Sequence, residues 1–188
     1  MRINRGLAAI AAASLLALSA CGSDTEIDEA TGEEVSTQTL ASLLTEPGEL
    51  STVASVMSDA GLSEVFDGNA QYTVFAPTDA AFETLGDSRA AFEGEEGRPA
   101  MVALMREHIV PGYLTVEDIT KAIADNGSGK VEMQTMGASP LTFAMDGDVI
   151  TITAGDGTSA KLAGDNLRAS NGVIVPVDAV LKDFPVTE

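Results

Sequence analysis

The sequence predicts an α+β domain, with helices in the first two thirds of the chain and a run of short strands after them. Apolar residues recur at helical spacing before residue 125, and from Gly129 onward they alternate with polar residues. An apolar block at 72–76 ends at Pro77, which has no N–H to donate to a sheet. Helices first and strands later are typical of α+β domains rather than of alternating α/β folds.

Two amphipathic helices are expected between residues 40 and 60. Pro47-Gly48 ends the first, and Gly61 is suited to end the second because glycine readily adopts the backbone conformation found after a helix. Their apolar faces consist of Leu40, Leu43 and Leu44, followed by Leu50, Val53, Ala54 and Met57.

Residues 72–82, with the sequence YTVFAPTDAAF, predict a strand, a sharp stop and the start of a helix. Tyr72 and Phe75 favour a strand. Thr78 or Asp79 can cap the following helix, and Phe82 gives that helix a large apolar side chain.

Two further helices follow an acidic loop around residues 93–97. Pro99 is placed to open the first of them, and His108 lies on its apolar side. Thr115 and Asp118 form the spacing of a capping box, which predicts the second helix. Beyond Gly129, alternating apolar residues predict strands separated by turns at 146–148 and 155–157.

Three segments resemble the signatures of fasciclin (FAS1) domains. Residues 73–82 resemble the first signature, and residues 171–181, NGVIVPVDAVL, resemble the closing one. Residues 107–112, EHIVPG, resemble a third element, in which Glu107 stands where a tyrosine is usual. In the closing signature Val175 replaces a histidine, and Pro176 stands where the strand usually continues, so an edge position or an early end to pairing is expected.

The resemblance implies one fasciclin domain at residues 36–183, built from two small sheets that form a wedge with helices alongside. The two signature strands are expected to lie together in the centre of one compact interior. The expected core residues are Phe75, Phe82, Ile109, Val110, Val173, Ile174, Val180 and Leu181. The residues that carry the signatures are Thr73, Phe75, Pro77, Thr78, Asp79, Phe82, His108, Asn171, Gly172 and Asp178.

Residues 1–20 have the pattern of a bacterial lipoprotein signal peptide. Arg2 and Arg5 precede an apolar stretch too short to span a bilayer, and the stretch ends in LSAC at residues 18–21. The thiol of Cys21, which is the single cysteine of the chain, would receive a diacylglyceryl group, and its amine an acyl chain such as palmitate. The alternative is an ordinary secretory signal followed by an incidental cysteine.

The lipoprotein interpretation predicts a protein exported and anchored in the bacterial cell envelope, because two or more acyl chains hold a protein stably at a membrane. Gly22 is not the aspartate that commonly retains lipoproteins in the inner membrane, so the outer membrane is favoured in a Gram-negative host. Residues 21–35 are acidic and contain no lysine or arginine, which predicts a flexible tether. Residues 184–188 form a short C-terminal tail.

Composition argues against several kinds of function. The net charge is −19, which disfavours nucleic acids and anionic lipid surfaces as partners. His108 is the single histidine, which excludes a metal site with two imidazoles and makes a nucleophile–base–acid relay hard to build. The aspartate-glycine turns lack the spacing of an EF-hand. We therefore expect no enzyme, no metal and no cofactor, and interpret His108 as a core imidazole, with a pH-sensitive latch or partner contact as the alternative.

A candidate interaction edge lies just before the closing signature. Some animal fasciclin domains carry an Asp-Ile pair there that is linked to integrin binding, and Asn166 and Leu167 occupy the equivalent positions, followed by Arg168. The resemblance implies a cell-surface adhesion or protein-interaction module whose partner is a cell-envelope or extracellular-matrix protein or glycan. The alternatives are a periplasmic carrier lipoprotein for a small ligand and, less favoured, an unusual hydrolase.

Overall fold

The computed structural model describes residues 25–27, 34–86 and 94–182. Cys21, the expected signal peptide and the expected C-terminal tail lie outside these ranges. None of the helices in the described ranges is both long enough and apolar enough to cross a membrane.

A four-stranded central sheet brings the two signature strands together. Its order is β4 (Ile109–Pro111), β3 (Tyr72–Pro77), β10 (Gly172–Val177) and β9 (Leu167–Ala169). β3 and β10 pair in parallel, with Val74 opposite Ile174 and Phe75 opposite Val175, whereas the two outer strands pair antiparallel. The expectation that the signature strands lie together in the centre is confirmed.

The second sheet is an antiparallel meander. It consists of β5 (Lys130–Gln134), β6 (Pro140–Asp146), β7 (Val149–Thr153) and β8 (Ser159–Lys161), in that order. Side chains alternate between buried and more exposed along β6 and β7, as the period of two predicts. Gly147 has a φ of 64° in the turn between them, a conformation that glycine adopts without strain.

Six helices are present in the described ranges. They are α1 (Leu40–Leu44), α2 (Ser51–Asp59), α3 (Ser63–Phe66), α4 (Asp79–Glu83), α5 (Gly94–Glu107) and α6 (Val116–Asp125). Thr78 caps α4 through a bond from Ala81 N–H, and α6 begins with the expected capping box. α3, a single turn, was not predicted.

The start of α5 differs from the prediction. The helix begins at Gly94 rather than at Pro99, so the expected acidic loop is in part its first turn. Pro99 has no N–H and so cannot make its backbone hydrogen bond within the helix. Glu95 and Glu96 interact favourably with the positive end of the helix dipole, which offsets part of that loss.

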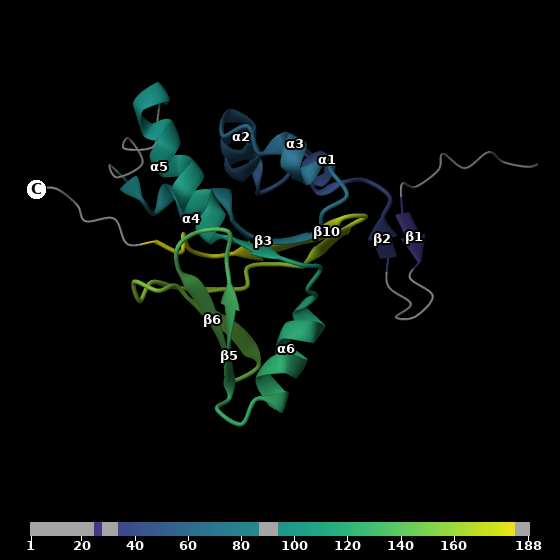
Figure 1. Cartoon of the computed structure of the whole chain (residues 1–188), viewed down its shortest axis with the longest axis vertical. Coiled ribbons are helices and arrows are strands. Elements are labelled where there is room, and N and C mark those ends of the chain that lie inside the picture. The colour runs from purple at the N-terminus through teal and green to yellow at the C-terminus, as the bar shows by residue number, and fades with distance from the viewer. Residues whose placement is uncertain (1–24, 28–33, 87–93, 183–188) are drawn as a thin grey trace, which may run out of the picture.

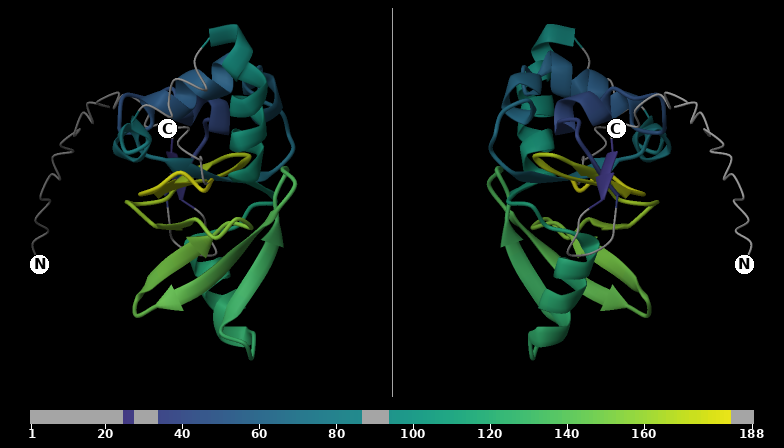
Figure 2. Two further views of the ribbon diagram at one scale, coloured as in Figure 1. Left: turned by 90° about the vertical axis from the view of Figure 1, so that its left-hand side faces the viewer. Right: turned by 90° about the vertical axis from the view of Figure 1, so that its right-hand side faces the viewer.

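Helices α1 to α5 lie on one side of the central sheet, and the meander sheet and α6 lie on the other (Figures 1 and 2). In Figure 2 the two sheets meet as a wedge, which agrees with the predicted α+β class. Because the central sheet has elements packed on both faces, its middle strands are buried on both sides, and β3 and β10 are almost continuously apolar.

The central sheet divides the interior into two cores. Ile174 belongs to the core beneath the helices, together with Leu40, Phe66 and Met105. Phe75 belongs to the core inside the wedge, where its ring centroid lies 5.1 Å from that of Phe143. All eight expected core residues are buried. The expectation of a single interior is wrong, because successive side chains of a strand point to opposite faces.

Pro176 lies just beyond the regular pairing of β10 with β9. β9 pairs with residues 172–174, whereas the pairing with β3 continues to Val177. The Pro176 carbonyl accepts a bond from Ala163 N–H (2.9 Å), so its backbone faces away from β3. The regular pairing with β9 thus ends before the proline, as the early end to pairing predicted, and an isolated antiparallel bridge joins Val177 to Leu162 beyond it.

Part of the expected tether is folded. β1 (Thr25–Ile27) and β2 (Glu34–Ser36) pair antiparallel, and β2 lies beside β9. The flexible-tether prediction is therefore wrong for these two stretches. A strand pair bonds its own backbone groups, and it needs little apolar surface when it lies next to an existing sheet edge.

Candidate interaction groove

Two polar residues of the first signature bond to the starts of two helices, α4 and α2. Thr78 caps α4, while the adjacent Asp79 reaches across to the start of α2, whose own N-cap residue makes no side-chain bond. Asp79 accepts from Thr52 N–H (2.8 Å) and from the Ser51 hydroxyl (2.7 Å). Burial raises the pKa of Asp79, but these hydrogen bonds lower it and give a net decrease. Thr78 and Asp79 were both candidates for the cap of α4. In the structure Thr78 caps α4, and Asp79 accepts a backbone hydrogen bond at the start of α2 instead.

The closing signature fastens segments that are distant in the chain. The Asn171 side chain accepts from Leu40 N–H (2.8 Å) and donates to the carbonyls of Phe66 and Gly68 (2.7 Å each). A Cβ on Gly172 would lie 2.1 Å from the Tyr72 carbonyl oxygen, so this position accepts only glycine without movement of β3.

Thr73 and Asp178 are two further polar signature residues that hydrogen-bond to backbone groups distant in the sequence. The Thr73 hydroxyl donates to Gly112 O (2.8 Å) and accepts from Leu114 N–H (2.9 Å), which fixes the loop after β4. Asp178 accepts from Lys161 N–H (2.6 Å) and so joins the end of β10 to β8 of the other sheet. Among the apolar signature residues, Phe75 and Phe82 are buried.

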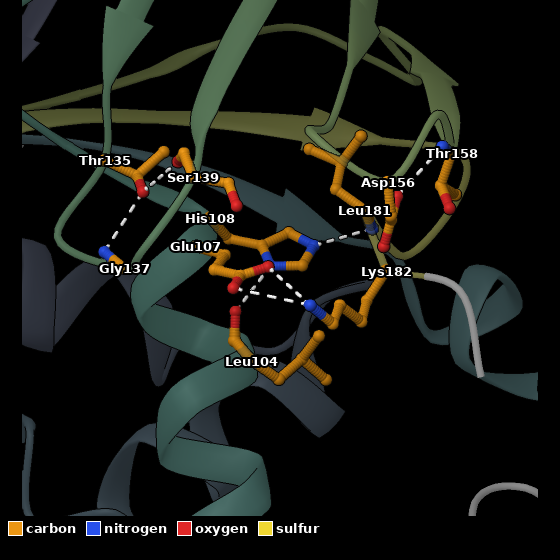
Figure 3. Close-up of polar contacts among 10 residues, drawn as sticks. All are labelled: Leu104, Glu107, His108, Thr135, Gly137, Ser139, Asp156, Thr158, Leu181 and Lys182. Carbon is orange, nitrogen blue, oxygen red and sulfur yellow. Dashed lines mark hydrogen bonds and ion pairs between the residues drawn. The ribbon is translucent and has the colours of Figure 1, made fainter.

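His108 is fully buried at the end of α5 and contacts only backbone in its two ring hydrogen bonds (Figure 3). Leu181 N–H donates to Nε2 (2.9 Å), so the ring proton is on Nδ1, which donates to Leu104 O (2.9 Å). Burial lowers the pKa of His108 to about 4, against the opposing effect of the bond to Leu104. This is the geometry of a neutral core imidazole that holds the C-terminal segment against the helix.

Glu107, which replaces the usual tyrosine, adds a second contact to the same segment. Its carboxylate pairs with Lys182 Nζ at 3.3 Å (Figure 3). The loop after β5 approaches from the other side, where a Cβ on Gly137 would lie 2.4 Å from Glu107 Cγ. The surroundings of His108 are thus filled by internal contacts.

The signature residues are therefore occupied in holding the fold together. In the part of the chain that the structure describes, no three His, Cys, Asp or Glu side chains gather as metal ligands would. The hydrogen bonds of these residues join segments of one chain that are distant in sequence.

The three residues of the expected interaction edge have different environments. Leu167, in β9, is 40% exposed, whereas Asn166 is half-buried. Arg168 is buried and its guanidinium pairs with Glu117 of α6 at 3.2 Å. The backbone edge of β9 lies beside β2, and Ser170 N–H donates to Gln38 O. Of the three side chains, that of Leu167 is therefore the most exposed.

Leu167 lies at the wall of a groove with a volume of about 290 Å³. The groove runs between the α1–α2 turn and the ends of β9 and β10 on the helix side of the central sheet. The sequence predicts Pro47-Gly48 only as the stop of a helix, and in the structure this turn also forms a wall of the groove. The lining residues are Leu43, Glu46, Pro47, Gly48, Glu49, Leu50, Thr78, Ala163, Gly164, Asp165, Leu167 and Pro176.

The lining combines apolar side chains with carboxylates. Leu43, Leu50 and Pro176 provide apolar surface, and Glu46, Glu49 and Asp165 provide negative charge. None of the lining residues is a lysine or an arginine. The groove can therefore accept an apolar group next to positive charge, and it disfavours anions.

The chain matches the family model described as the fasciclin domain over residues 48–183. It is similar to a solved structure described as a FAS1 domain pair from the insect cell adhesion molecule Fasciclin I. The TM-score is 0.59 at 22% identity, over 71% of this chain and 45% of that one.

Several curated proteins are similar in sequence. Human stabilin-1 is 26% identical over 145 residues, and Protein sll1483 of Synechocystis sp. is 26% identical over 132 residues. Transforming growth factor-beta-induced protein ig-h3 of Sus scrofa is 26% identical over 131 residues. These matches cover 77%, 70% and 69% of this chain, but only 5%, 66% and 17% of the respective relatives.

Proposed function

Because this chain belongs to the fasciclin domain family, we propose that it is a non-catalytic adhesion or protein-interaction module held at the bacterial cell envelope by a lipid on Cys21. The observation that carries the interaction role is the groove beside Leu167. The polar signature residues bond to their own chain, whereas this groove brings an exposed apolar side chain together with three carboxylate residues.

The similarities support adhesion as the class of function. The structural relative is described as a domain pair from a cell adhesion molecule, and it shares the fold of this chain. The carrier alternative needs a pocket that encloses its ligand, and such pockets typically have volumes of about 300–1,000 Å³. The groove, with a volume of about 290 Å³, is just below that range, which favours contact with a partner's side chain over enclosure of a small ligand.

The anchor proposal rests on residues 1–21. An apolar stretch that ends in LSAC supplies the thiol that lipidation requires. Each buried methylene contributes about 0.8 kcal/mol, so two or more acyl chains hold a protein at a membrane. Export to the envelope, with the outer membrane favoured in a Gram-negative host, follows from the same segment.

Cys21→Ser is expected to move the protein from the detergent-dependent membrane fraction to the soluble fraction and to abolish its display on the cell surface. Serine cannot form the thioether to diacylglycerol, so the stable anchor is lost. Fractionation followed by immunoblotting measures the effect, and Ser23→Ala serves as a control that leaves the thiol in place. Membrane retention of the Cys21→Ser protein would refute the lipid anchor.

Leu167→Ser is expected to reduce attachment of cells that display the protein to matrix or to other cells, because it removes an apolar contact at the groove. Val149→Ser is the matched control, since Val149 is 41% exposed and lies on the meander sheet, away from the groove. Arg168 is unsuitable as a test, because its side chain is buried and pairs with Glu117 of α6, so its replacement disturbs the packing between β9 and α6. Equal attachment by the Leu167 and Val149 variants would contradict the proposed interaction role.

A further inference from the structure

We infer that the groove beside β9 binds a segment of another protein chain in which an aliphatic side chain is flanked by lysine or arginine. This inference rests on the proposed function and adds the chemistry of the partner. It follows from the apolar surface of the groove, from its charge and from its size.

The apolar surface lies on two sides. Leu43 of α1 and Leu50 before α2 are almost fully buried and form the inner side, while Leu167 is 40% exposed at the opposite wall. Pro47 and Pro176 add rigid apolar surface. An aliphatic side chain placed among these groups removes Leu167 from water without any rearrangement of the core, which is favourable in proportion to the area covered.

The charges around this surface have one sign. Glu46, Glu49 and Asp165 carry carboxylates, and no lining residue carries positive charge. Gln38 Nε2 donates to Glu46 Oε1 (2.9 Å), which orients that carboxylate from outside the lining. Lysine or arginine on either side of the inserted residue would meet these groups, whereas an acidic segment would be repelled.

The same charges argue against other occupants. A second copy of this chain brings a net charge of −19 toward an acidic groove, and an anionic lipid headgroup is repelled as well. With a volume of about 290 Å³ the groove has room for one large side chain and its flanking residues, not for a folded domain. A short exposed segment of a basic partner therefore fits best.

The test uses the full-length protein purified in detergent and three labelled peptides of the same length. One has a central leucine between pairs of lysines, one has glutamates in place of the lysines, and one has glycine in place of the leucine. We expect the lysine-leucine peptide to bind most tightly by fluorescence anisotropy. We also expect its affinity to fall as salt is raised from about 50 mM to about 500 mM, since exposed charge pairs are screened.

Substitutions in the groove and on the meander sheet test whether the lysine-leucine peptide binds at the groove. Leu167→Ser is expected to weaken the lysine-leucine peptide about tenfold, and Val149→Ser to leave it unchanged. The double variant Glu49→Gln/Asp165→Asn is expected to weaken it about fivefold, consistent with the modest strength of exposed ion pairs. The control double variant Glu132→Gln/Asp148→Asn removes the same charge from the meander sheet and is expected to have no effect.

Equal binding of the lysine and glutamate peptides, or equal affinities in the groove and control variants, would overturn the inference. So would self-association in sedimentation experiments that Leu167→Ser abolishes, because the occupant would then be a second copy. If cell attachment still depends on Leu167 in any of these cases, the proposed function stands without this partner. If attachment does not depend on Leu167, the proposed function fails instead.

Discussion

Gly172→Ala is expected to lower the free energy of unfolding by about 3 kcal/mol or more. The new methyl group would lie 2.1 Å from the Tyr72 carbonyl oxygen and 2.6 Å from Leu40 Cδ1. The first contact is with backbone, so it can be relieved only by moving β10 away from β3, which breaks the parallel pairing at the centre of the fold. Urea unfolding followed by circular dichroism measures the change.

The control for Gly172→Ala is Gly127→Ala. A Cβ at Gly127 meets no heavy atom within 4 Å, so this variant tests the loss of glycine freedom without a clash. Its stability is expected to stay within about 0.5 kcal/mol of the unmodified protein. Similar stabilities for the two variants would show that β3 and β10 are not packed as closely as described.

Acidification is expected to lower the free energy of unfolding by up to about 3 kcal/mol through His108 alone. The pKa of His108 is about 4 in the folded protein, compared with an ordinary value of 6.5. Above pH 6.5 the imidazole is neutral in both states and its contribution is complete. As the pH falls from 6.5 toward 4, the unfolded chain binds a proton that the folded chain does not, so stability is lost across this window.

Urea unfolding at a series of pH values, compared with His108→Leu, isolates this contribution. The carboxylates are common to both proteins, and His108 is the single histidine of the chain, so the difference in pH dependence belongs to this residue. His108→Leu is expected to be less stable at pH 7, because Leu104 O and Leu181 N–H lose their partner, but to depend less on pH below 6.5. The same pH dependence in both proteins would contradict the buried neutral imidazole.

Most of the fold could be predicted from local patterns. The apolar spacing of α1 and α2, the capping box at Thr115 and the alternation in β6 and β7 each depend on residues close together in the chain. Residue burial followed the same patterns, because an apolar side chain at the regular period of its element faces the interior. The placement of β3 beside β10 came from the family resemblance and from the short apolar runs between turns.

The features that could not be predicted depend on contacts between distant residues. The Asn171 side chain meets Leu40 N–H across 131 positions, and Asp79 caps a helix that precedes it in the chain. Arg168 was expected at the interaction edge, but its side chain is buried and pairs with Glu117. The Pro47-Gly48 turn, expected only as a helix stop, also forms a wall of the groove. No local period or motif encodes these positions, since they are set by how the finished elements pack.

The parallel pairing of β3 with β10 also constrains when this protein can fold. The two strands are about a hundred residues apart, so the central pairing cannot form until β10 has been synthesised. Closing so long a loop carries a large entropy cost before any contact compensates for it, which makes assembly slow. A chain that has not yet added β10 lacks the central strand pair, so the other elements of the domain have no complete sheet on which to pack.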